Sequence, residues 1–313
     1  MAEEHLQNVS VIRPIMPAIE RVKVMLFKPF DLAKWFTIGF CAWLAYLFQG
    51  GGGGGGGNFS NPQQGGCPNF PAVFNEHLVL IIVLGAVIAC IVIAITVVCL
   101  WLSSRGKFMF LHCVATNKAE VKIPWHQYRQ HGNSLFVFRL VAGIISIVAI
   151  AVLAGIITGL GFLMHHNGIG KWEMALLLVP VSLITLLPVL IAIMVFFKFT
   201  SDFVIPIMFL RANKAVEGWR EFLGILSANK GIFALYILFQ IIIAMAIGAI
   251  VFAAALTACC FCCCTACIWF IPYISTVILL PVLVFKLAYS LYFLRQFGPQ
   301  LDVFTPMAIQ SIS

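Results

Sequence analysis

Cysteine is the residue type with the most chemistry to offer, because six of the eleven cysteines lie between positions 259 and 267. Two C-x-x-C spacings within this run are typical of zinc and iron–sulfur ligands, although no histidine accompanies them. Disulfide formation, which could include Cys67, and simple packing of a small apolar side chain are the alternatives. The sequence leaves these three interpretations open for Cys259, Cys260, Cys262, Cys263, Cys264 and Cys267.

A lysine inside an apolar segment is the second candidate. Lys286 precedes Arg295 by nine residues, which is about 13 Å along a helix. An ionisable group within a membrane-spanning helix is costly and commonly functional. Asp31 and Asp202, both expected at helix ends, are the predicted partners. Structural pairing, or snorkelling of the lysine to the interface, is the simpler role; ion or proton coupling is the alternative.

The rest of the sequence carries no catalytic constellation. His165 and His166 are adjacent, whereas a helical zinc site needs two histidines four positions apart, and neither G-x-S-x-G nor H-E-x-x-H occurs. Only eleven residues are acidic, and few of them lie near expected helix boundaries, which argues against a paired-carboxylate site. We therefore predict that the protein is not an enzyme and that it needs no cofactor.

The amino-acid composition predicts the kind of structural element that positions the candidate cysteines and Lys286. The chain of 313 residues is 62% apolar and 10% charged, whereas soluble domains are near 45–50% and about 25%. The mean hydropathy of +1.05 excludes a soluble enzyme, a disordered chain and a small disulfide-stapled secreted domain. Membrane helices must therefore carry the candidate residues.

Six apolar stretches approach the roughly 20 residues that a spanning helix needs. They predict an all-α, polytopic transmembrane bundle forming a single integral membrane domain over residues 1–313. The expected spans are 32–48, 77–102, 135–163, 174–197, 231–257 and 272–294.

Basic residues fix the expected orientation. The N-terminal arm counted up to Lys34, the 103–134 loop and the 198–230 loop hold five Lys or Arg residues each, whereas the intervening loops hold only Lys171. The positive-inside rule then places both termini in the cytoplasm of a cell inner (plasma) membrane. The net charge of +8 is thus a topology signal and a source of attraction to anionic headgroups, and we expect no nucleic-acid partner.

The two basic loops resemble one another. MFL, then NKA, then Trp recur in order from Met109 to Trp125 and from Met208 to Trp219. We infer a degenerate parallel repeat, 77–163 and 174–257, which is common in membrane transport folds but is found outside them too. The second loop and the arm 1–31, through residues 17–30, also have the apolar periodicity of interfacial amphipathic helices. The helix in the arm could equally pack against the protein's own loops.

Two outer loops complete the organisation. Loop 49–76 contains the octaglycine Gly50 to Gly57, for which we favour a flexible tether over a strand threaded between helices. Loop 258–271 is the cysteine-rich one, and the last span follows it at 272–294.

FKPFDLAKWFTIGFCAWLA running into the octaglycine, with DFVIPIMFLRANKAVEGWREF before the fifth span, carries a family resemblance. The sequence resembles an uncharacterised group of prokaryotic six-helix membrane proteins, loosely similar to the membrane domain of glycerophosphodiester phosphodiesterases. The resemblance implies an inner membrane and no active residues, because the catalytic domain of those enzymes is absent here.

Three functions follow as hypotheses. The first is a non-enzymatic structural, scaffolding or envelope-related membrane protein, with other copies of the chain as expected partners. The second is a small transporter or channel component that uses Lys286. The third is thiol, disulfide or metal chemistry at the outer cysteines.

Overall fold

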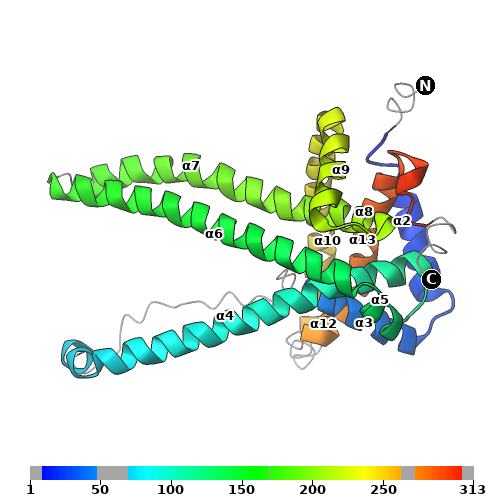
Figure 1. Ribbon diagram of the computed structural model, residues 1–313, viewed down its shortest axis with the longest axis horizontal. Coiled ribbons are helices and arrows are strands. Elements are labelled where there is room, and N and C mark those ends of the chain that lie inside the picture. The colour runs from blue at the N-terminus through cyan, green and yellow to red at the C-terminus, as the bar shows by residue number, and fades with distance from the viewer. Residues whose placement is uncertain (1–8, 48–69, 169, 262–271, 305–313) are drawn as a thin grey trace.

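The computed structural model describes residues 9–47, 70–168, 170–261 and 272–304, and its regular elements in these ranges are all helical. Figure 1 shows their arrangement. In chain order the elements are α2 (Ile15–Val22), η1 (Lys23–Phe27), α3 (Leu32–Tyr46), α4 (Phe70–Thr116), α5 (Lys122–Gln127), α6 (Arg129–His166), α7 (Lys171–Phe199), η2 (Thr200–Val204), α8 (Ile205–Arg211), α9 (Ala215–Ala228), α10 (Lys230–Phe261), α12 (Pro272–Ile278), α13 (Leu280–Arg295) and η3 (Pro299–Leu301).

Four helical stretches within the described residues are long and apolar enough to cross a membrane. No residue of the most apolar window is buried in three of them, and 11% are buried in the fourth, so most of the apolar side chains there face outward. A helix that is apolar all round and unburied is suited to lipid. The stretches are Ile82–Thr116, Arg129–His166, Trp172–Arg211 and Lys230–Ala253.

The first and last predicted spans form shorter helices. α3 has 15 residues and α13 has 16, so each is about 22–24 Å long, short of a hydrocarbon core of about 30 Å. A break at Leu279 separates α12 from α13. Four of the six predicted segments therefore lie in candidate spanning helices; the total of six spans and the internal repeat remain predictions.

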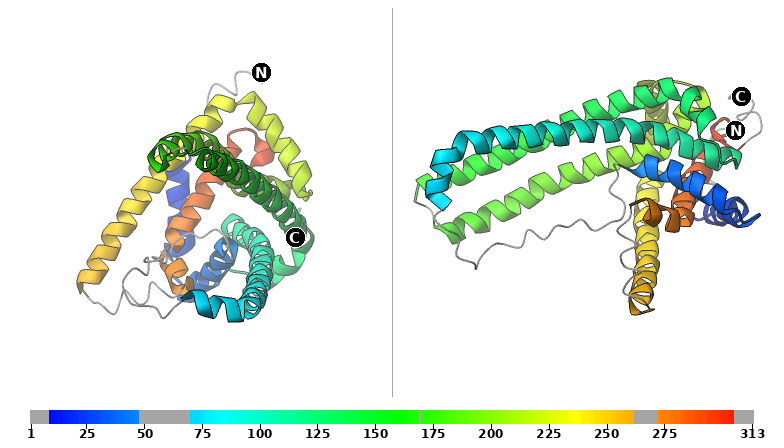
Figure 2. Two further views of the ribbon diagram at one scale, coloured as in Figure 1. Left: turned by 90° about the vertical axis from the view of Figure 1, so that its left-hand side faces the viewer. Right: turned by 90° about the horizontal axis from the view of Figure 1, so that it is seen from below.

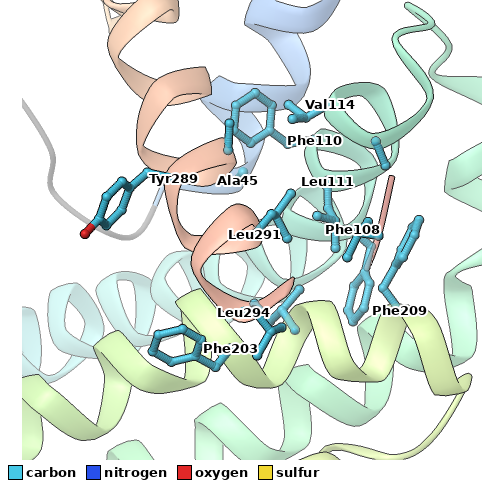
Figure 3. Close-up of a cluster of buried hydrophobic side chains, with 14 of the residues drawn as sticks. Ala45, Phe108, Phe110, Leu111, Val114, Phe203, Phe209, Tyr289, Leu291 and Leu294 are labelled. Atoms are coloured by element: carbon cyan, nitrogen blue, oxygen red, sulfur yellow. The ribbon is translucent and has the colours of Figure 1, made fainter. Parts of the chain in front are cut away.

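The buried residues gather where these helices meet. We call this region the base; it comprises α2, η1, α3, α4 from Leu100 onward, α5, η2, α8, α9, α13 and the first turns of α6 and α10. Figure 3 shows part of its apolar core, with Phe108 and Leu111 from α4, Phe203 from η2 and Leu294 from α13 pointing toward one another. The base is the only part of the described chain in which large side chains are extensively enclosed.

Glycine allows the closest approach in the base. A Cβ atom added at Gly106 of α4 would lie 2.6 Å from the backbone nitrogen of Ala45 and from the carbonyl carbon of Leu44, both in α3. No real Cβ atom occupies such a space, so only glycine permits this crossing. Cys41 of α3 and Cys113 of α4 face each other across the same interface, with their Sγ atoms 3.9 Å apart.

The amphipathic arm packs on the protein itself. α2 contacts α13, and Ala18, Met25 and Leu26 are buried there. Arg21 donates hydrogen bonds to the carbonyl oxygens of Val114 and Ala115 at the end of α4. Of the two roles expected for this segment, packing against the protein's own elements is the one that the contacts favour.

Beyond the base the long helices diverge. α4, α6 and α7 extend to the same side of the molecule in Figure 1, and α6 packs against both of the others. α10 leaves the base in a different direction, as the two views of Figure 2 show. Only its first turns are packed, through Phe233, Tyr236 and Gln240.

The two related loop segments begin alike and then differ. MFL is buried in both, at the end of α4 and in α8, apart from Leu210, which is partly exposed. Each helix ends just before a non-glycine residue with positive φ, Asn117 at 59° and Ala212 at 53°. Such left-handed residues terminate helices. The two segments then differ in the helix that follows, which is the short α5 after the first segment and the longer α9 after the second.

Candidate functional site

A carboxylate at the end of α7 organises the polar residues of the base. The chain changes there from α-helix to the π-helical turn η2, an element found frequently at functional sites. Asp202 lies in this turn, four residues after Lys198, and the lysine Nζ is 2.8 Å from Asp202 Oδ2. The side chain of Asp202 is 15% exposed, so the pair lies at the margin of the base.

α10 supplies the next residues. Tyr236, which is fully buried, donates its hydroxyl to Asp202 Oδ2 at 3.0 Å. The same hydroxyl accepts a hydrogen bond from Gln240 Nε2 at 2.9 Å. Tyr236 and Gln240 are four positions apart and hence on one face of α10. This chain of hydrogen bonds ties the first turns of α10 to η2.

α4 and α6 contribute from the other side. Lys107 is buried and donates through Nζ to the Ser201 hydroxyl. One turn earlier, Ser103 Oγ donates to the carbonyl oxygen of Ala45 at 2.9 Å and lies 3.5 Å from Arg139 Nη1. α3, α4, α6, η2 and α10 therefore meet through side-chain hydrogen bonds. We define the polar cluster as Ser103, Lys107, Arg139, Lys198, Ser201, Asp202, Tyr236 and Gln240.

Lys286 lies beside this cluster. It is half-buried in α13, and the charges of Lys198 and Asp202 both act on it. Of the two predicted partners, Asp202 is the one whose charge acts on Lys286, and the pairing itself stays a prediction. Asp31 has another role, because its Oδ1 accepts a hydrogen bond from the backbone N–H of Ala33 and caps α3.

The predicted cysteine site falls outside what the structure describes. Cys67 and the four cysteines from Cys262 to Cys267 lie in undescribed segments, and only the backbone is described at Cys259 and Cys260. Within the described residues, no group of three or more His, Cys, Asp or Glu side chains could hold a metal ion.

A local signal could have revealed part of the polar cluster. Ser103 and Lys107 in α4, and Lys198 and Asp202 at the end of α7, are polar pairs at the i, i+4 spacing inside otherwise apolar helices. Arg139 sits in the same kind of context in α6. Lys107 and Lys198 were expected in the basic loops 103–134 and 198–230, and their convergence on Asp202 and Ser201 was not predicted.

Two further features flank the cluster. The Arg105 guanidinium lies 4.2 Å from the ring centre of Trp101 and 5.0 Å from that of Trp125, a double cation–π contact. An open apolar groove of about 390 Å³ runs between α9 and α10, with Ser227 and Lys230 among its lining residues. Neither feature contains a set of groups that could catalyse a reaction.

Residues 9–272 match a family described as a family of unknown function (DUF7544). The chain belongs to this family. The matched range runs from the start of the base to the start of α12, so it contains every residue of the polar cluster and leaves out Lys286. No curated protein and no solved structure matches the chain.

Proposed function

We propose that this family member is a non-enzymatic, multi-pass membrane protein with a structural or scaffolding role in the cell envelope. The observation that carries the proposal is the contrast between the base, which is closely packed, and the long helices, whose apolar side chains are exposed. Leu176 of α7 is 81% exposed and Phe162 of α6 is 70% exposed. Surface of this kind is covered by lipid or by protein, so the helices are available for assembly within the membrane.

A second copy of the chain is the partner that we propose. Gly155 and Gly159 of α6 form a G-x-x-x-G motif, which lets membrane helices approach closely. A Cβ atom at either position would meet nothing within 4 Å, whereas one at Gly161 would touch Leu178 of α7. The motif thus faces away from α7 and is open in a single chain.

The experiment compares two variants of α6 in lipid nanodiscs or mild detergent. Gly155→Leu combined with Gly159→Leu should shift the protein from an oligomer to a monomer, measured by light scattering and by single-molecule photobleaching. Gly143→Leu is the matched control, since Gly143 is also open but lies on another side of the helix. A wild-type protein that stays monomeric, or a control that dissociates equally, would sink the self-assembly proposal.

A complementation test in cells distinguishes a structural role from a transport role. For a structural role, the double glycine variant should fail to complement a strain that lacks the gene, whereas Asp202→Asn should complement it. The expected location, an inner membrane with both termini in the cytoplasm, is checked by reporter fusions to each terminus. Periplasmic activity of either fusion would contradict that orientation.

Transport is the second candidate, and the polar cluster favours it. Ionisable residues buried where several membrane helices meet mark ion and proton paths in many transporters. In proteoliposomes, Asp202→Asn would then abolish a flux that the double glycine variant retains. The third hypothesis, thiol or metal chemistry at the outer cysteines, remains a prediction; replacing all six with alanine without any phenotype would contradict it.

A further inference from the structure

Arg139 is a buried cation that has no carboxylate partner among the described residues. The residue is 6% exposed, and the contact of its Nη1 atom with the Ser103 hydroxyl, at 3.5 Å, is long for a hydrogen bond. A guanidinium has five N–H donors and does not lose its proton in proteins. None of the described carboxylates lies within ion-pair distance of it. Most of the donors of Arg139 therefore have no acceptor in the described part of the chain.

A second buried cation stands next to it. Lys107, 8% exposed, lies one turn after Ser103 on α4, and the charge of Arg139 acts on it. Asp202 is the carboxylate that acts on Lys107, and it already binds Lys198 Nζ and the Tyr236 hydroxyl through one oxygen. Among the described residues, Lys198 and Lys107 thus share the carboxylate of Asp202, and Arg139 adds a positive charge to which no carboxylate is paired.

Burial makes this unpaired positive charge expensive. A charge removed from water is tolerated where it is paired and hydrogen-bonded, and the cost is several kcal/mol per ion where it is not. The remaining guanidinium nitrogens of Arg139 are not among the fully enclosed atoms without a partner, so they retain some exposed surface. An anion at this place would remove the imbalance.

The hydrogen-bond donors of Arg139 and Lys107 indicate which kind of anion would bind. A planar guanidinium fork beside an ammonium group matches the several oxygens of a phosphate group. Arg139 lies ten residues, about 15 Å, into α6, where the apolar part of that helix adjoins the base. Headgroup phosphates of a bilayer lie at such a boundary.

We propose that a phosphate group, either free or in the headgroup of an anionic phospholipid, binds at Arg139 and Lys107. This site is independent of the proposed structural role, which rests on the exposed helices. The phosphate compensates the two buried cations and links α4 to α6.

Binding is measured on the full chain by native mass spectrometry and by thermal shift in detergent. The probes are inorganic phosphate and phosphatidylglycerol, with chloride and phosphatidylcholine as the matched comparisons. Wild-type protein should retain and be stabilised by at least one phosphate probe. Arg139→Gln should weaken that binding about tenfold to a hundredfold, as expected for hydrogen bonds to a charged group. Arg129→Gln, at an exposed arginine of the same helix, should leave it unchanged.

The two probes distinguish the sources. Stabilisation by inorganic phosphate and by the lipid indicates a site open to free phosphate, whereas stabilisation by phosphatidylglycerol alone indicates a headgroup site. Arg139→Lys, which keeps the charge and loses the fork, should bind more weakly than wild type and more strongly than Arg139→Gln. The proposal is overturned if wild-type protein binds neither probe above its comparison, a result that does not depend on any variant folding. Equal loss in Arg129→Gln would overturn it as well.

Discussion

Replacing Gly106 with alanine should force α3 away from α4. The added Cβ atom would lie 2.6 Å from two backbone atoms of α3 and 2.8 Å from Leu44 Cβ. Carbon atoms in favourable contact are about 3.5–4.0 Å apart, so the helices must separate by roughly 1 Å. Backbone atoms cannot rotate aside as the end of a side chain can, and the whole crossing must move.

The cost follows from what such a movement breaks. Overpacking a close contact costs about 1–3 kcal/mol. A shift of that size would also lengthen the hydrogen bond from Ser103 Oγ to the Ala45 carbonyl oxygen beyond its present 2.9 Å, which removes about 1 kcal/mol. Alanine regains up to about 1 kcal/mol through its higher helix propensity. We therefore expect a net loss of about 1–3 kcal/mol in the free energy of unfolding.

Gly85→Ala is the matched control. It makes the same substitution in the same helix, where a Cβ atom would meet nothing within 4 Å, and it should not destabilise the protein. Unfolding is followed in detergent by circular dichroism, and labelling of the buried thiol of Cys41 reports locally on the α3–α4 interface. The reasoning fails if Gly106→Ala is as stable as Gly85→Ala and Cys41 stays equally protected in both.

Three other substitutions test separate parts of the base. Arg21→Met should increase hydrogen exchange in the last turn of α4, because Arg21 donates hydrogen bonds to the carbonyl oxygens of Val114 and Ala115. Burial lowers the pKa of Arg21, but from a value far above neutrality, so the guanidinium group stays charged. Phe222→Ala should cost about 3–5 kcal/mol by chemical unfolding, because this buried ring is surrounded by other aromatic rings; a loss below 1 kcal/mol would contradict that packing. Lys286→Met should leave folding and cellular function unchanged, since none of the described acids forms an ion pair with it; retained folding with lost flux in proteoliposomes would favour transport.

Length and hydropathy are local properties, which is why the four long helices could be predicted from sequence. α6 was expected over 135–163 and extends over Arg129–His166, and the other three also run beyond their apolar limits. Their ends enter the base, where tertiary packing supports polar turns that hydropathy alone would leave out.

The first and last segments show where such prediction stops. A buried helix of a packed base and a short spanning helix have the same apolar composition, so composition alone does not decide which of the two 32–48 and 272–294 form. The arm illustrates a second limit. Residues 17–30 were expected to form one amphipathic helix, yet the helical structure ends at Phe27, and Pro29, which lies beyond that end, is exposed.

The polar cluster was only partly predictable. The pairing of Lys198 with Asp202 is local and follows from their spacing within one helix. The approach of Lys107 to Ser201, and of Tyr236 to Asp202, depends on the rotation of separate helices about their axes. That rotation is set by packing in the base, on which hydropathy carries no information. The pairing of Lys286 with Asp202 stays a prediction, although the charge of Asp202 acts on Lys286, whereas Asp31 caps its own helix.

Three hydroxyls of the long helices already have hydrogen-bond acceptors outside the base. The hydroxyls of Ser146, Thr158 and Thr185 each donate to a carbonyl oxygen one turn earlier in the same helix, at 2.7–2.9 Å. Polar groups in lipid must be satisfied within the protein, and these already are. These hydroxyls therefore give the apolar surfaces around them no reason to pair, and we expect association there to rely on close van der Waals contact. For that reason side-chain volume at Gly155 and Gly159, rather than the loss of a hydroxyl, is the informative change for testing assembly.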